Sequence, residues 1–128
     1  MTRLLASRTQ IVAALEAGGL NPATTGKWSA PCVLVEPGEP WAAVDLSMGR
    51  RRTGRWRLTA VAGKTDTEGA FEELAELVDK TDTALLAVAG LELPTWARPV
   101  DLTLGGATYA ATVATVQLLT PTQTEVLP

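Results

Sequence analysis

The sequence contains no histidine and a single cysteine, Cys32, among its 128 residues. Without histidine there is no histidine general base and no Cys–His nucleophile, and most kinds of zinc site are excluded as well. A lone cysteine also excludes a disulfide within the chain. Cys32 opens an apolar run, so we expect a small core residue rather than a nucleophile. These absences favour a binding or assembly role over an enzyme, and we expect no metal and no cofactor.

The other residues that could act in catalysis do not form a recognisable catalytic motif. Ser7, Ser29 and Ser47 have no histidine partner, which leaves only a Ser–Lys arrangement open. The triplet 63–65 (Gly-Lys-Thr) follows a predicted strand and precedes a predicted helix, as in a phosphate-binding loop. That loop needs a glycine five residues before Gly63, where this chain has Leu58. We therefore expect a strand-to-helix turn there, and a small hydrolase or nucleotide-binding enzyme is the less favoured alternative.

Long apolar runs are also missing. The longest uncharged stretch, residues 102–124, is rich in threonine and is interrupted by Gly105, Gly106 and Pro121, so it does not resemble a membrane span. The N-terminal segment MTRLLASRTQIVAAL carries two arginines and lacks the unbroken apolar stretch and the cleavage site of a signal peptide. We expect no membrane contact, and synthesis and retention in a cytoplasm.

The composition that is present is that of one globular domain. Hydrophobic residues make up 46% and charged residues 20% of the chain, and a chain of this length can bury its own core. We expect a single α+β domain over residues 1–120, followed by an extended C-terminal arm over residues 121–128.

Positive charge is concentrated in one short segment. Five arginines and no acid occur between positions 49 and 57, and because the whole chain carries −3, the remainder carries −8. Such a cluster favours oriented contact with an anionic partner, either a protein with acidic patches or the backbone of DNA passing nearby. A solvated loop is the alternative. The expected partner-binding residues are Arg50, Arg51, Arg52, Arg55 and Arg57.

Two helices are predicted by apolar periodicity. The first spans residues 3–17, capped by Thr2 and ended by Gly18-Gly19. The second carries Phe71, Leu74, Ala75 and Val78 at helical spacing, with acids on its other face. Thr65 and Glu68 have the spacing of a capping box for this helix. Around residues 81–83 the helix either continues or restarts.

The remaining segments predict strands. Short strands are expected at residues 32–35 and 42–47, separated by a turn at 37–40, and at 55–60 after a loop at 48–54 that makes the arginines the tip of an antiparallel hairpin. A second hairpin turns at Gly105-Gly106, and its return strand covers about 107–119. The order α-β-β-β-α-β-β predicts an α+β fold: a mostly antiparallel sheet with two main helices packed on one side.

The last strand carries no charge that would protect an exposed edge, and neutral edges recruit other chains. Apolar residues lie on both of its faces, through a bulge or because both faces are covered. An interior strand is the alternative to a subunit interface. The expected interface residues are Tyr109, Ala111, Val113, Val116 and Leu118.

This arrangement resembles the tail terminator proteins of long-tailed, non-contractile bacteriophages (siphophages). The resemblance covers most of the chain and lies in three segments: the helix RLLASRTQIVAALEAGG, the strand LTAVAGKTD running into EGAFEELAELVDK, and the closing hairpin VDLTLGGATYAATVATVQLL. It implies a homo-hexameric ring that caps the tail tube, ends its polymerisation and meets the head-side connector.

The implied partners are copies of the chain itself, the tail tube protein and the connector or neck protein, with DNA passing through the ring without sequence-specific binding. The implied location is the neck end of the virion tail, after assembly in the host cytoplasm. A head-completion or neck protein of the same particle is the alternative. Members of the family share little sequence, so the resemblance transfers no site residue, and the site residues rest on the sequence alone.

Overall fold

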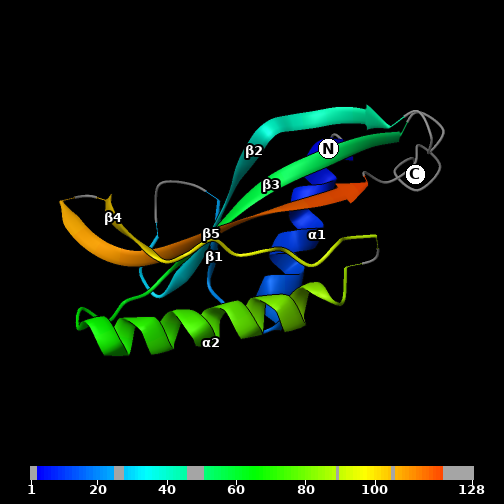
Figure 1. The fold of residues 1–128 in the computed structure, drawn as a ribbon. Coiled ribbons are helices and arrows are strands. Elements are labelled where there is room, and N and C mark those ends of the chain that lie inside the picture. The colour runs from blue at the N-terminus through cyan, green and yellow to red at the C-terminus, as the bar shows by residue number, and fades with distance from the viewer. Residues whose placement is uncertain (1–2, 25–27, 46–50, 89, 105, 120–128) are drawn as a thin grey trace.

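The structure is a computed structural model that describes residues 3–24, 28–45, 51–88, 90–104 and 106–119 (Figure 1). The predicted α+β class and the order α-β-β-β-α-β-β are confirmed. The elements are α1 (Arg3–Ala17), β1 (Pro22–Ala23), β2 (Cys32–Asp45), β3 (Arg51–Val61), α2 (Thr67–Leu85), β4 (Val100–Leu104) and β5 (Ala107–Leu119). The proposed helix cap Thr2 and the proposed arm at 121–128 lie outside the described residues.

The five strands form one sheet in the order β1-β2-β3-β5-β4. Strand β1 is parallel to β2, and the other neighbouring pairs are antiparallel. Strand β5 therefore lies inside the sheet, between β3 and β4. Beyond the end of β4, the chain segment 91–97 follows the margin of β5, where Ala97 N–H donates to the Val113 carbonyl oxygen at 2.9 Å and Leu91 bridges to Leu118.

Strand β2 is longer than the sequence suggested. The predicted turn at 37–40 does not reverse the chain: β2 continues to Asp45 beside β3, and its register shifts between Pro37 and Ala42. A register shift accommodates prolines, which have no N–H for a regular ladder. The two predicted strands 32–35 and 42–47 are thus one, and the short β1, predicted as loop, supplies the remaining strand of the order.

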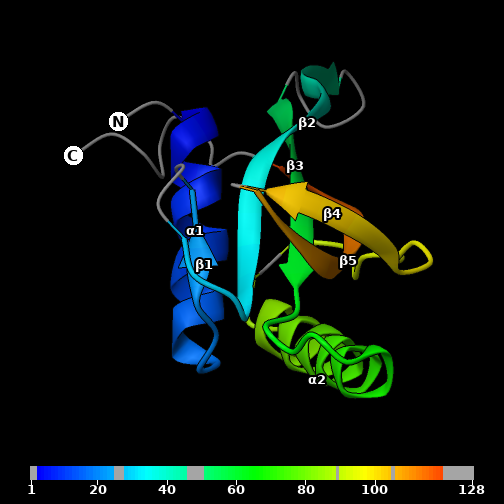
Figure 2. The ribbon, with the colours of Figure 1, turned by 90° about the vertical axis from the view of Figure 1, so that its left-hand side faces the viewer.

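Both helices pack on the same face of the sheet (Figure 2). Ile11 and Leu15 of α1 and Leu85 of α2 meet Trp56 and Leu58 of β3 in the main cluster. Leu74 and Leu77 of α2 form a second cluster around Ala60 and Ala62. This face supplies most of the buried apolar area, the main favourable contribution to folding.

Helix α2 differs from its prediction at the N-terminal end, and at the other end one of the two predicted alternatives holds. Its N-cap is Asp66 rather than Thr65: the Asp66 carboxylate accepts from the Gly69 N–H at 2.7 Å, so the predicted Thr65–Glu68 capping box is wrong by one position. The helix then continues without a break through residues 81–83. Thr81 is fully buried, and its hydroxyl has no hydrogen-bond partner among the described residues. Packing of Leu77 and Leu85 on the sheet, on either side of the threonines, outweighs their poor helix propensity.

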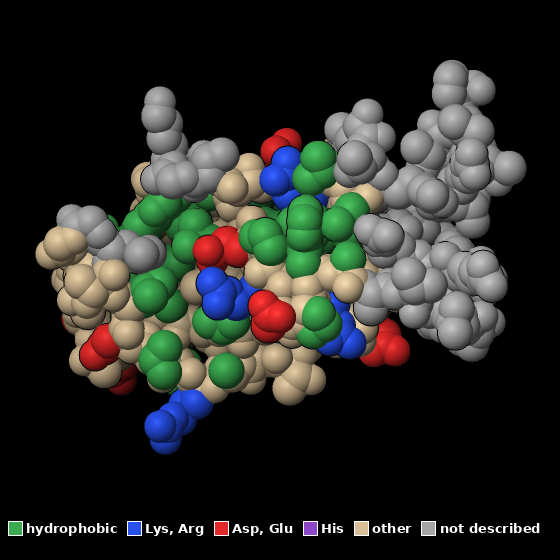
Figure 3. Space-filling model, turned by 90° about the horizontal axis from the view of Figure 1, so that it is seen from above, with side chains coloured by type: hydrophobic (Ala, Val, Ile, Leu, Met, Phe, Trp, Pro, Cys, Tyr) green, Lys and Arg blue, Asp and Glu red, His purple; other side chains and the backbone are tan. Residues whose placement is uncertain are grey.

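No helix among the described residues covers the other face of the sheet. Figure 3 shows the molecule from above, on the side away from α2, with hydrophobic side chains gathered between acidic and basic ones. At one end of this face Cys32, Val61 and Ala111 are buried beneath Trp28 and Tyr109, whose rings meet edge to face with centroids 5.3 Å apart. We call the rest of it the uncovered sheet face; it carries Leu34, Glu36, Arg55, Arg57, Val113, Thr115 and Gln117.

Candidate partner-binding surface

The arginine cluster lies along a strand rather than only at a hairpin tip. The hairpin itself is as predicted, but β3 begins at Arg51, which pairs with Asp45, and Arg52 pairs with Val44. The predicted loop at 48–54 is therefore too long, because backbone pairing with β2 extends the strand. Arg50 lies outside the described residues.

Arg55 and Arg57 are on the uncovered sheet face. They alternate along β3 with Trp56 and Leu58, which are buried on the helix side, so the predicted inward and outward sets of this strand are confirmed. This alternation brings the two guanidinium groups to the same side of the sheet, separated by one intervening residue.

Each of these arginines has one polar partner. Arg55 Nε donates to Gln117 Oε1 of β5 at 3.0 Å. Arg57 Nη2 lies 3.4 Å from Glu36 Oε1 of β2, and the two side chains are 51% and 43% exposed. An ion pair this exposed contributes little to stability. A guanidinium has five N–H donors, so both arginines keep donors for a partner.

Apolar side chains adjoin the arginines on the same face. Leu34 pairs with Thr59 across β2 and β3, and Val113 pairs with Thr59 from β5, which puts Leu34 and Val113 on either side of a buried threonine. Both apolar side chains are half-buried. The uncovered sheet face thus combines a partly exposed apolar centre with a cationic end.

The expected interface on β5 is only partly compatible with the structure. Ala111, Val116 and Leu118 are 1–2% exposed, within the chain's own core, so they offer no surface to another subunit and the expectation is wrong for them. The physical reason is that β5 is an interior strand with strands or segment 91–97 on both margins. Val116 and Leu118 face the helices, whereas Ala111 lies on the opposite face beneath Trp28 and Tyr109, and no register shift separates these positions. Tyr109 and Val113 are half-buried on the same face as Ala111, and for them an interface stays a prediction.

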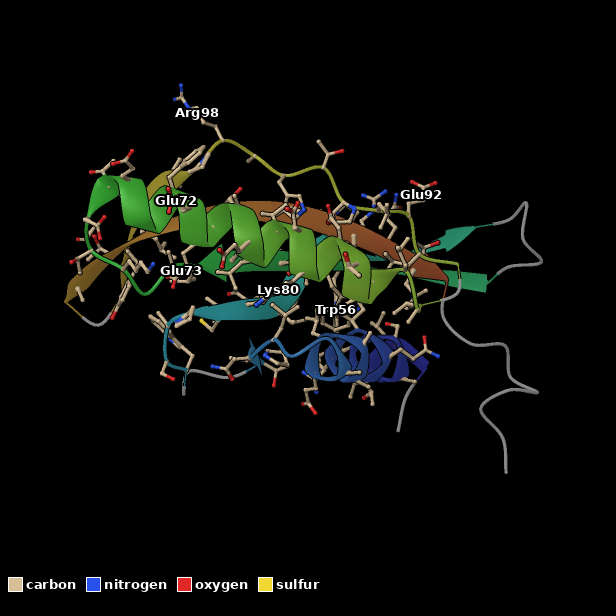
Figure 4. All side chains as sticks on the ribbon, turned by 90° about the horizontal axis from the view of Figure 1, so that it is seen from below. Trp56, Glu72, Glu73, Lys80, Glu92 and Arg98 are labelled. Atoms are coloured by element: carbon tan, nitrogen blue, oxygen red, sulfur yellow. The ribbon has the colours of Figure 1, made fainter. Side chains whose placement is uncertain are left out.

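The turn at residues 63–65 is occupied by a carboxylate of the chain itself. The Gly63 and Lys64 N–H groups both donate to Glu73 Oε1 of α2, the latter at 3.1 Å (Figure 4). These are the backbone donors that a phosphate would require at this position. The contact supports the predicted strand-to-helix turn over the nucleotide-binding alternative.

The buried serine and cysteine have structural surroundings. Ser7 is fully buried and accepts a hydrogen bond from the Trp56 indole at 2.9 Å, while its own hydroxyl donates to the Leu4 carbonyl oxygen. Burial raises the pKa of the Cys32 thiol to about 11, so the thiol stays protonated near neutral pH. Ser47 lies outside the described residues. Within the described residues, the hydrogen-bond partners of Ser7 are thus an indole and a backbone carbonyl rather than the lysine of a Ser–Lys arrangement.

Two grooves open on the described surface. One, of about 420 Å³, lies between the C-terminal ends of α1 and α2 and is lined mainly by small side chains such as Ala14, Ala17 and Ala87. The other, of about 380 Å³, lies between β5 and segment 92–97. Among the described residues no group of three or more acidic, cysteine or histidine side chains is placed to hold a metal ion.

Comparison with known proteins leaves the chain without an assigned family. No protein-family model matches it, and no curated protein matches it significantly. None of the helices in the described part of the chain is long and apolar enough to cross a membrane.

Proposed function

We propose that the chain is a structural virion protein, the tail terminator of a long-tailed, non-contractile bacteriophage. The observation that carries the proposal is the order α-β-β-β-α-β-β with both helices on one face of the sheet and a row of arginines on the other. The three sequence segments on which the resemblance rests form α1, the end of β3 with α2, and the β4–β5 hairpin of this fold. The protein would form a ring on the finished tail tube, end its growth and present a surface to the head-side connector.

The proposed mechanism is one of repeated contacts. A closed ring fixes the number of subunits, and a contact that is weak for one subunit becomes strong when the ring repeats it. Arg55 and Arg57, both reachable from solvent on one face, would recur once in each subunit of such a ring. DNA would pass through the central hole without sequence-specific binding.

The test is genetic. In a phage that carries this gene, an early stop codon should give tails of uncontrolled, excessive length together with filled heads that lack tails, seen by electron microscopy. Purified protein added to growing tubes should restore the normal length. A synonymous codon change at the same position is the control and should leave the particles normal.

Tails of normal length beside unfinished heads would overturn the proposal and would instead identify a head-completion or neck protein. Normal, infectious particles made with the stop codon would exclude both assembly functions.

A further inference from the structure

The outer face of α2 carries a row of carboxylates. Glu68, Glu72 and Glu76 follow one another at intervals of four residues, and Asp79 lies one turn after Glu76. All four side chains are exposed, and Figure 4 shows the position of Glu72 on the helix. Like charges at this spacing destabilise a helix. Lys80 follows Glu76 at the same interval and offsets the end of the row. In the part of the chain that the structure describes, the one ion pair joins Arg57 to Glu36, so the carboxylates of Glu72 and Glu76 have no ion-pair partner among the described residues.

The spacing of this row matches that of the arginines. Residues four apart on a helix are separated by about 6 Å along its axis. Residues two apart on a strand, such as Arg55 and Arg57, are separated by about 7 Å. Glu72 and Glu76 can therefore face the two arginines simultaneously, one carboxylate for each guanidinium.

Apolar side chains adjoin both rows. Phe71 of α2 is 62% exposed and Ala75 is exposed beside it. The uncovered sheet face has half-buried Leu34 and Val113 beside its arginines. An apolar centre with a charged margin is the usual anatomy of a protein interface.

The two surfaces cannot meet within one chain. Helix α2 packs on one face of the sheet (Figure 1). Arg55 and Arg57 lie on the opposite face, because they alternate along β3 with the buried Trp56 and Leu58. Contact between them requires two copies in a head-to-tail arrangement. Head-to-tail contacts close into a ring when the rotation between copies allows it.

We infer that the uncovered sheet face of one copy binds the outer face of α2 of a second copy, with Arg55 and Arg57 paired to Glu72 and Glu76. The inference deepens the proposed function and rests on it for the closure of the ring. The weak, exposed pair between Arg57 and Glu36 exchanges for the new contact at little cost.

Charge reversal tests the contact. By light scattering, the native protein should have at least twice the 13.5 kDa mass of one chain. The Arg55→Glu/Arg57→Glu variant and the Glu72→Arg/Glu76→Arg variant should each have the mass of a single chain. Mixing these two variants should restore the assembly, because each then offers the surface that the other lacks. Neutral Arg55→Gln/Arg57→Gln provides a milder version that should raise the dissociation constant at least about tenfold.

Matched controls come from segment 91–99, outside both surfaces. Arg98→Glu and Glu92→Arg each reverse one exposed charge, half of the change made in each double variant, and should leave the native mass unchanged (Figure 4). Circular dichroism establishes that each variant is folded before its mass is interpreted. A monomeric native protein, reversed variants that still assemble, or a mixture that stays monomeric would each overturn the inference.

This experiment separates the contact from the proposed function. If mixing restores the assembly but the stop-codon phage has tails of normal length, the contact stands and the terminator function is wrong. If the phage has overlong tails but charge reversal leaves the mass unchanged, the terminator function stands and this contact is wrong.

Discussion

Trp56 is the residue around which the main core is organised. Its ring is 1% exposed, and its indole N–H donates to the Ser7 hydroxyl, which in turn donates to the Leu4 carbonyl oxygen. The hydroxyl therefore acts as acceptor and donor at once and ties β3 to the first turns of α1. A buried polar pair that is fully satisfied in this way stabilises one specific packing of helix on sheet.

Ser7→Ala should destabilise the protein by about 1–3 kcal/mol, because it leaves the buried indole N–H without an acceptor. Helix propensity alone would give the opposite sign, since alanine is the better helix former. The measurement is urea unfolding followed by tryptophan fluorescence. Unchanged or increased stability would contradict the structural role of the hydroxyl.

The control for this prediction is Trp56→Phe. In that background the donor is gone, so Ser7→Ala should cost less than it does in the native protein. Equal costs in the two backgrounds would mean that the serine acts through something other than the indole.

At the scale of single residues, the sequence predicted burial but not the side-chain hydrogen bond between Ser7 and Trp56. The apolar run that begins at Cys32 predicted a buried thiol, and Cys32 is fully buried. The bond between Ser7 and Trp56 joins residues 49 positions apart, and no local pattern contains that information. Only the packing of α1 across β3 brings the two side chains together.

At the scale of elements, the two helices approach each other closely at Gly18. A Cβ atom added at Gly18, at the end of α1, would lie 2.8 Å from the Ala84 Cβ of α2. Real Cβ atoms do not come this close, so glycine at this position is required by packing. The junction fixes the C-terminal end of α1 against the last turns of α2.

Gly18→Ala should destabilise the protein by about 1–3 kcal/mol through overpacking at this junction. Where there is room, the same change stabilises by about 0.4–1 kcal/mol because it restricts the unfolded chain. Thermal unfolding measures the difference. In an Ala84→Gly background the clash is removed, and Gly18→Ala should then be neutral or stabilising; a loss of equal size in both backgrounds would contradict the contact.

The sequence predicted the elements best where periodicity is regular. Residues 3–17 and 107–119 are α1 and β5 with the predicted bounds, because each has a sustained apolar repeat. Prediction failed at residues 37–40, where prolines that favour a turn lie within a strand held by β3. It also failed at the start of α2, where Thr65 and Asp66 are both good caps and only the geometry selects Asp66.

On the scale of the whole molecule, the fold places the arginines of β3 and the acids of α2 on opposite faces of the sheet. The sequence showed five arginines in one segment and acids along the second helix. It did not show that the sheet lies between them, so that Arg55 and Arg57 face away from the Glu72 row. The expected interface on β5 was wrong for Ala111, Val116 and Leu118 for the same reason: whether a neutral strand is an edge depends on strand order, which no residue of β5 encodes by itself.

This separation gives a prediction for the assembled protein. Raising NaCl from about 0.1 M to about 1 M shortens the Debye length from about 10 Å to about 3 Å. The dissociation constant between copies should then rise at least about tenfold, because paired charges on opposite faces provide much of the attraction. Analytical ultracentrifugation across this range measures the change, with thermal unfolding as the check that each chain stays folded. An assembly held mainly by Phe71, Leu34 and Val113 would instead keep or increase its affinity in salt, and that outcome would remove the arginine row from the contact.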